Sequence, residues 1–173
     1  MQLDQFKFTG LQNFGPIQEK IFKIIYIAFQ GQTNYEFQQA IEEAVQNAAR
    51  YSVDGPYNAN ITIIIRRMAF DIAVSVYSET NAFDALAYRD RLQKLMLNPK
   101  YYDMDWGDYV ADSTASSGFW YMLTGCNYIY LDADGQSITL VARTEGVNLN
   151  IEPTTKIGQL VPRFLIKKEG VIQ

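Results

Sequence analysis

Few residue types in this chain of 173 residues are suited to catalysis. The sequence contains no histidine, so the commonest general base and zinc ligand is missing. Its single cysteine, Cys126, has no basic neighbour in the sequence that would lower its pKa. We therefore interpret Cys126 as a structural thiol rather than a nucleophile, and one thiol cannot form an internal disulfide. With no paired-carboxylate or phosphate-binding motif either, we expect no enzyme activity and no cofactor.

Three closely spaced aspartates, Asp103, Asp105 and Asp108, resemble the start of a calcium-binding loop. An EF-hand loop requires Gly at its sixth position and Glu at its twelfth. Counted from Asp103, these positions hold Asp108 and Thr114. We therefore expect a solvated acidic segment and no metal site.

Aromatic residues are interleaved with these acids, at Tyr101, Tyr102, Trp106 and Tyr109. Aromatic side chains in a connecting segment can pack on the nearest core. They can also anchor a partner protein, because Tyr and Trp are enriched in interfaces. Both readings stay open from the sequence, and we name these four residues as candidate partner contacts.

The charge distribution argues against nucleic acid as a specific partner. The net charge is −4, and residues 99–118 hold four acids against one base, whereas the rest of the chain is nearly balanced. Sequence-specific binding to nucleic acid is not expected, because such affinity comes largely from clustered Lys and Arg. No secretory signal is visible at the start. The apolar residues 17–29 are too few for the roughly 20 that a membrane-spanning helix needs.

The first hundred residues show mainly helical periodicity. Residues 1–15 are expected to form an extended arm, followed by a helix that starts at Pro16 and ends near residue 30. A capping box from Thr33 to Glu36 predicts the start of a second helix, which continues a few residues past Arg50. Residues 61–78 are long and apolar enough to predict a buried helix, and a fourth helix is expected from about residue 83 to Pro99.

The last third of the chain alternates with the period of strands. After an acidic aromatic loop over residues 100–118, short strands are predicted at 119–124, 127–131, 137–142, 147–151 and 163–168. A hairpin turn is expected at residues 132–135. The last strand can extend the sheet of a neighbour, so Phe164 and Ile166 join the candidate partner contacts.

The expected fold is therefore α+β, an N-terminal four-helix cluster followed by a small antiparallel β-sheet. Its parts are the arm (residues 1–15), a helical bundle (16–99), the acidic aromatic loop (100–118) and an antiparallel β subdomain (119–173). Within the bundle, Arg66 and Arg67 must reach water or a carboxylate. They are expected to pair with Asp71 or Asp90 in the same chain, or with a residue of another subunit.

The expected helix pair between Asn60 and Pro99 resembles the head–tail adaptor (connector) proteins of tailed bacteriophages. The likeness lies in a helix of the type RRMAFDIAVSVYSE, which ends near an aromatic such as Tyr77, and a second helix of the type AYRDRLQKLM after a short link. It covers about 40 of the 173 residues.

The resemblance implies a structural virion protein of the phage neck, assembled in the host cytoplasm. Such a protein would form a ring of its own copies that joins the portal to tail or neck proteins and lets DNA pass. Asp103, Asp105 and Asp108 would then face the DNA channel, where like charge prevents adhesion. The alternative is a small acidic cytoplasmic protein-binding module, of the inhibitor or immunity type.

Overall fold

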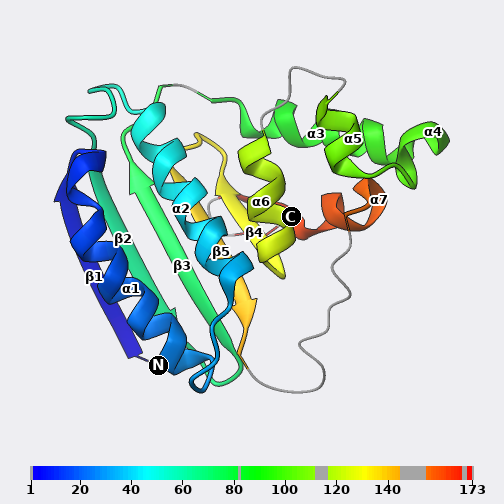
Figure 1. The fold of residues 1–173 in the computed structure, drawn as a ribbon. Coiled ribbons are helices and arrows are strands. Elements are labelled where there is room, and N and C mark those ends of the chain that lie inside the picture. Colours follow the sequence, from blue (N-terminus) through cyan, green and yellow to red (C-terminus); the bar gives the residue numbers. More distant parts are fainter. Residues whose placement is uncertain (1, 82, 112–116, 145–154, 169–170, 173) are drawn as a thin grey trace.

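One mixed β-sheet organises the chain in the computed structural model, with strands drawn from both halves of the sequence (Figure 1). The structure describes residues 2–81, 83–111, 117–144, 155–168 and 171–172. The strand order is β1-β2-β3-β5-β4-β6-β7; β4 and β6 are parallel and all other neighbours are antiparallel. The strands are β1 (Gln2–Thr9), β2 (Asn60–Arg67), β3 (Asp71–Ser78), β4 (Tyr128–Asp132), β5 (Ser137–Arg143), β6 (Phe164–Lys168) and β7 (Val171–Ile172).

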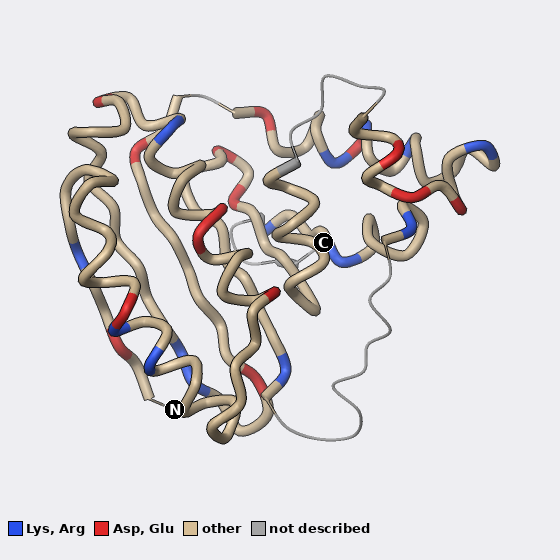
Figure 2. Tube along the Cα trace, in the orientation of Figure 1, with Lys and Arg blue, Asp and Glu red and all other residues tan. Residues whose placement is uncertain are grey.

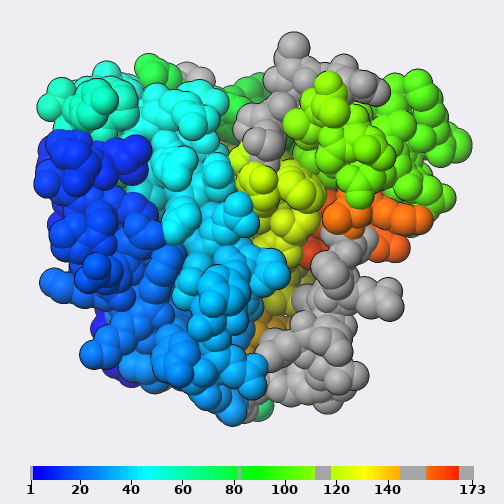
Figure 3. Space-filling view, in the orientation of Figure 1, coloured from blue at the N-terminus to red at the C-terminus, as the bar shows by residue number. Residues whose placement is uncertain are grey.

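Helices α1, α2 and α6 lie on one face of this sheet (Figure 1). In the space-filling view the side chains of α1 and α2 hide most of β1, β2 and β3 (Figure 3). The reverse side of these three strands carries no helix from the described part of the chain (Figure 1). The helices are α1 (Gly15–Ala28), α2 (Tyr35–Arg50), α3 (Ala85–Leu97), α4 (Pro99–Tyr102), α5 (Trp106–Ala111), α6 (Ser117–Gly125) and α7 (Ile157–Leu160), with 3₁₀ turns η1 (Leu11–Asn13) and η2 (Val161–Arg163).

The expected N-terminal four-helix cluster is wrong, because residues 61–78 form the antiparallel hairpin β2–β3. Burial alternates along β2: Ile61, Ile63 and Ile65 are fully buried under the helices, and the residues between them are half-buried on the other face. β3 is buried on both faces over most of its length, which produced the continuous apolar run. A short link closes the hairpin, with the Met68 N–H donating to the Asp71 carbonyl at 2.9 Å.

The expected N-terminal arm is the edge strand β1, paired with β2 along its whole length. Its side chains alternate, so that Phe6 and Phe8 point toward the helices and Leu3 lies exposed on the other face. The Phe8 ring stacks on Phe14, just before α1, with 5.6 Å between the ring centroids. This contact ties the edge strand to the first helix.

Three of the four predicted helices at the start of the chain are confirmed, the first two as α1 and α2. The N-cap of α2 is Asn34 rather than Thr33, because the Asn34 carboxamide oxygen accepts the N–H of Phe37 at 2.9 Å. The fourth predicted helix is confirmed as α3. The segment 100–118, expected as a loop, contains α4, α5 and the start of α6.

Strands at 128–132, 137–143 and 164–168 confirm three of the five predicted for the last third of the chain. The turn between β4 and β5 is also confirmed: the Gly135 N–H donates to the Asp132 carbonyl at 2.9 Å, and Gly135 has φ +74°. The strand predicted at 119–124 is wrong, because these residues form α6, and the one at 147–151 lies outside the described residues. Since β5 pairs with β3, these strands belong to the central sheet and form no separate subdomain.

Neither arginine at the end of β2 pairs as expected with Asp71 or Asp90. Arg67 forms an ion pair with Asp4 of β1 at 3.3 Å. Arg66 instead donates to the hydroxyl of Ser75 at 3.2 Å, and that hydroxyl lies 2.8 Å from the hydroxyl of Thr139. Both contacts therefore link neighbouring strands of one subunit.

The contact between α2 and α6 yields a stability prediction. A Cβ added at Gly125 would lie 2.2 Å from the Glu36 carbonyl oxygen and 3.0 Å from the Cβ of Ala40. We expect Gly125→Ala to lower the free energy of unfolding by about 1–3 kcal/mol, because backbone must move to make room. Gly15→Ala is the matched control, since nothing lies within 4 Å of its added Cβ. Urea unfolding measures both, and equal stability of the two variants would contradict this packing.

Candidate functional site

A pocket of about 520 Å³ lies on the helix-covered face of the sheet. Its floor is formed by Val76 of β3, Leu131 of β4 and Ile138 of β5, which all point to this face. Helices α2, α6 and α3 line its sides. The volume is in the range of roughly 300–1,000 Å³ that is usual for small-molecule sites.

Small side chains on α2 leave this space open. Ala44 and Ala48 line the pocket one turn apart, whereas Ala40, one turn earlier, sits against Gly125 of α6. Longer side chains at these two positions would close the gap between α2 and α3. On α6 the pocket is bounded by Phe119 and Met122.

The rim of the pocket is held by contacts between the end of β3 and the β4–β5 turn. Thr80 donates its hydroxyl to the Gly135 carbonyl at 3.3 Å. A Cβ at Gly135 would meet Phe83 at 2.8 Å, so glycine is required for this close approach as well as for the positive φ. Asn81 adds two bonds to the Tyr51 carbonyl, from its backbone N–H at 2.9 Å and its side-chain amide at 3.2 Å.

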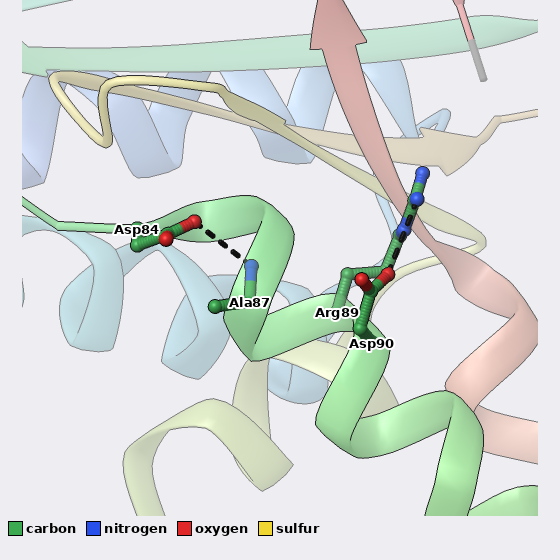
Figure 4. A network of polar contacts seen from close by, with 4 residues as sticks. All are labelled: Asp84, Ala87, Arg89 and Asp90. Carbon is green, nitrogen blue, oxygen red and sulfur yellow. Dashed lines mark hydrogen bonds and ion pairs between the residues drawn. The ribbon is translucent and has the colours of Figure 1, made fainter.

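Helix α3 carries the charged residue of the pocket, and the start of this helix is capped. The Asp84 carboxylate accepts the N–H of Ala87 at 2.8 Å (Figure 4). Arg89 turns away from that cap and lies 3.4 Å from the Asp90 carboxylate (Figure 4). Two other residues of α3, Tyr88 and Arg91, face the pocket.

Arg91 is the only charged residue among the described residues that line the pocket. Its guanidinium carbon lies 5.0 Å from the centre of the Tyr88 ring, a distance typical of a cation–π contact. Within the described part of the chain Arg91 forms no ion pair. Burial raises the pKa of the Tyr88 phenol to about 12, against a partial opposing effect of Arg91. The phenol is therefore neutral at physiological pH.

An aromatic cluster fixes α3, α5, α6 and β6 together behind this pocket. The Tyr88 ring lies 5.2 Å from Phe119 and 6.0 Å from Phe164, and these last two rings are 5.1 Å apart. Trp106 joins the cluster at 6.4 Å from Phe119. Most of these pairs meet edge to face, the arrangement that aromatic quadrupoles favour.

Three of the six candidate partner contacts are therefore part of the core of this chain. Trp106 is 1% exposed, Phe164 is 3% exposed and Ile166 is fully buried. Trp106 therefore packs on the core, the first of its two predicted alternatives, and the side chains of Phe164 and Ile166, predicted only as partner contacts, are buried as well. On its outer side the strand β6 pairs with β7 only at Lys167 and Lys168.

The other three candidate contacts lie nearer the surface. Tyr101 and Tyr109 are half-buried, with ring centroids 5.9 Å apart. Tyr102 is 45% exposed but rests on α7, where a Cβ at Gly158 would come within 2.5 Å of its ring. Of the six, Tyr102 offers the largest exposed fraction.

The three candidate acidic residues do not converge on one point. Asp103 is exposed and lies 3.7 Å from the Lys156 ammonium group. Asp105 accepts the backbone N–H of Gly107 at 2.7 Å and so closes a local turn at the start of α5. Asp108 is exposed on α5. Among the described residues, no group of three or more acids, cysteines or histidines is placed to hold a metal ion.

Charges of both signs are interspersed along α3, α4 and α5 (Figure 2). The acidity of this region is thus partly compensated by the bases of α3 and by Lys100.

Cys126 is 2% exposed, and burial raises the pKa of its thiol above the ordinary range. A protonated, buried thiol fits the structural role that the sequence predicts.

Sequence reasoning missed the pocket because its lining comes from elements far apart in the chain. The one available signal was the stripe of alanines on α2, which is also typical of close helix packing.

Comparisons with known proteins give no further information about the site: no protein-family model matches the chain, and no curated protein matches its sequence. No helix in the described part of the chain is long and apolar enough to cross a membrane.

The raised pKa of Tyr88 gives a pH-dependent prediction. Its neutral form is favoured in the folded state, so its contribution to the free energy of unfolding is complete below pH 10.0 and is lost as the pH rises to about 12. We expect Tyr88→Phe to make the fall in stability across this window shallower. Tyr57→Phe is the control, because it removes a phenol that is 72% exposed. Urea unfolding at stepped pH tests this, and the same slope in both variants would contradict the burial of Tyr88.

Proposed function

We propose that this protein is a structural assembly subunit that acts by contact, and that it forms the ring of a tailed-phage neck between portal and tail. The observation that carries the proposal is the free edge of β1, eight residues long and paired on one side only. Such an edge is a template for a strand of another chain.

The hydrogen-bond pattern defines which groups this edge offers. The Gly10 N–H donates to the Ala59 carbonyl at 2.9 Å, and these two residues come directly after the last pair of the β1–β2 register, Thr9 and Asn60. Hydrogen-bonded pairs alternate along an antiparallel ladder. The N–H groups of even-numbered residues in β1 therefore point to β2. Those of the odd-numbered residues point outward: Leu3, Gln5, Lys7 and Thr9.

The neck assignment itself comes from the family resemblance. Only one of the two segments that carry this resemblance is a helix in the structure. The AYRDRLQKLM segment is helical in α3, whereas RRMAFDIAVSVYSE spans the β2–β3 turn and β3. The proposal therefore rests on α3, on the free edge of β1, and on a chain without histidine or a convergent acidic cluster among its described residues.

Blocking the edge of β1 tests self-assembly. Gln5→Pro removes an outward N–H while leaving every β1–β2 bond in place, and Gln5 is exposed. We expect the variant to keep its thermal stability and to lose ring formation, measured by native mass spectrometry with and without the portal protein that its genome encodes.

Gln5→Ala is the matched control, because it retains the N–H and should assemble normally. If Gln5→Pro forms rings as well as Gln5→Ala does, the edge of β1 is not the assembly interface. If the protein stays monomeric in the presence of the portal, or binds one unrelated protein in a 1:1 complex, the alternative of an acidic binding module would be favoured over the neck proposal. Absence of portal and tail genes beside its own gene would count against the neck as well.

The proposed acidic channel lining has its own test. Asp103→Lys and Asp108→Lys change exposed side chains, whereas Asp105 is left intact because it closes a turn. If these acids line the DNA path, we expect the double variant to slow DNA ejection from assembled particles, since positive charge would hold phosphates. Asp54→Lys, on an exposed turn far from this segment in the sequence, is the control. Unchanged ejection would remove the channel role.

A further inference from the structure

The pocket between α2, α3 and α6 has a chemistry that differs from the rest of this acidic chain. Its floor and sides are apolar, and none of its described lining residues is an acid. The chain as a whole carries a net charge of −4. A pocket with one cation and no carboxylate in such a chain selects against positively charged ligands.

The cation of the pocket is accessible to solvent. Arg91 is exposed, lies over the Tyr88 ring and has no carboxylate partner within the described residues. Its guanidinium can therefore donate two parallel hydrogen bonds to an incoming acidic group. The cation–π contact limits the motion of the side chain and so reduces the entropy lost on binding.

The pocket is also lined by neutral polar groups. Asn47 of α2 and Gln136 of the β4–β5 hairpin line it, and their carboxamides can donate to or accept from a ligand. The neutral Tyr88 phenol adds no negative charge that would repel an anion. An apolar interior with a few polar groups is the usual arrangement of a small-molecule site.

From these features we propose that the pocket binds a small amphipathic monoanion, a compact aromatic or branched aliphatic body that carries one carboxylate or sulfonate. The body would occupy the space above Val76 and Ile138, and the acidic group would pair with Arg91. This site goes beyond the proposed assembly role and does not depend on it, since β1 contributes nothing to the pocket.

Anilinonaphthalene sulfonate, an aromatic body with one sulfonate, is a suitable fluorescent probe for the full-length protein. We expect saturable binding at one site per chain, with native near-ultraviolet circular dichroism retained. Phenylbutyrate should displace the probe, whereas phenylbutylamine, its cationic counterpart of nearly equal size, should not. Absence of saturable binding, or equal displacement by the amine, would overturn the proposal.

Two variants locate the site. Arg91→Gln should weaken the binding of the probe by about tenfold, because one charge-assisted contact is lost. Lys94→Gln, which removes a charge from an exposed position of the same helix outside the pocket, should leave the affinity within about twofold. Ala48→Phe should abolish binding by filling the space.

Circular dichroism on each variant separates loss of binding from loss of folding. If Ala48→Phe does not fold, Arg91→Gln with its Lys94→Gln control still decides the outcome. Binding that Arg91→Gln leaves unchanged would show that the probe sits elsewhere, and the proposed site would be withdrawn.

Discussion

The close packing of α2 against the sheet on one side and against α6 on the other is the constraint on which the rest of the structure depends. Ala40, Ala44 and Ala49 are almost fully buried along α2, together with the larger Phe37, Ile41 and Val45. Gly125 allows α6 to pack equally closely against α2, because a Cβ at this position would clash with the Glu36 carbonyl. Dispersion and apolar burial act over this whole contact, and both weaken steeply when helices are forced apart. The position of α6 then determines where Phe119 lies, and Phe119 is the residue on which Tyr88, Trp106 and Phe164 converge.

The aromatic cluster gives the second half of the chain its order. The short helices α4, α5 and α7 are too brief to be stable alone, because nucleating a helix costs more than a single turn returns. They are held by tertiary contacts: Trp106 is buried, its backbone N–H donates to the Thr155 carbonyl at 2.8 Å, and Tyr102 covers Gly158. From the sequence, the aromatic residues of this segment could contact either a partner or the core. In the structure most of them pack inside the chain. What remains for a partner is the outer surface of these helices, with Tyr102 as its most exposed aromatic among the six candidate contacts.

The sequence predicted the elements whose pattern is local and failed where burial on two faces masks the pattern. α2 was predictable because its apolar residues repeat with helical period on one face only. β2 and β3 were not: Ile64 and Ser75 lie on the face opposite the helices yet are half-buried or buried, so the two-residue alternation disappears into an apolar run. The turn between them contains no Gly, Pro or Asn that would mark a hairpin. The pocket could not be predicted from the sequence for a different reason. The position of α3 relative to α2 follows from long-range aromatic contacts, which no sequence spacing encodes.

The two surfaces for which we propose functions lie in different parts of one sheet. The free edge of β1 is separated from β3, the first strand in the floor of the pocket, by the whole of β2, which amounts to roughly 10 Å in the hydrogen-bonding direction. β2 is firmly held, with its inward isoleucines fully buried and Arg67 paired to Asp4. Changes at sites this far apart with no shared partners usually add independently. A strand added at β1 can therefore extend the sheet without altering the pocket, and a ligand in the pocket can bind without competing for the edge. Coupling between them would have to pass through the tilt of β3 under α2, where the packing is tightest and a shift would disturb the core on both sides.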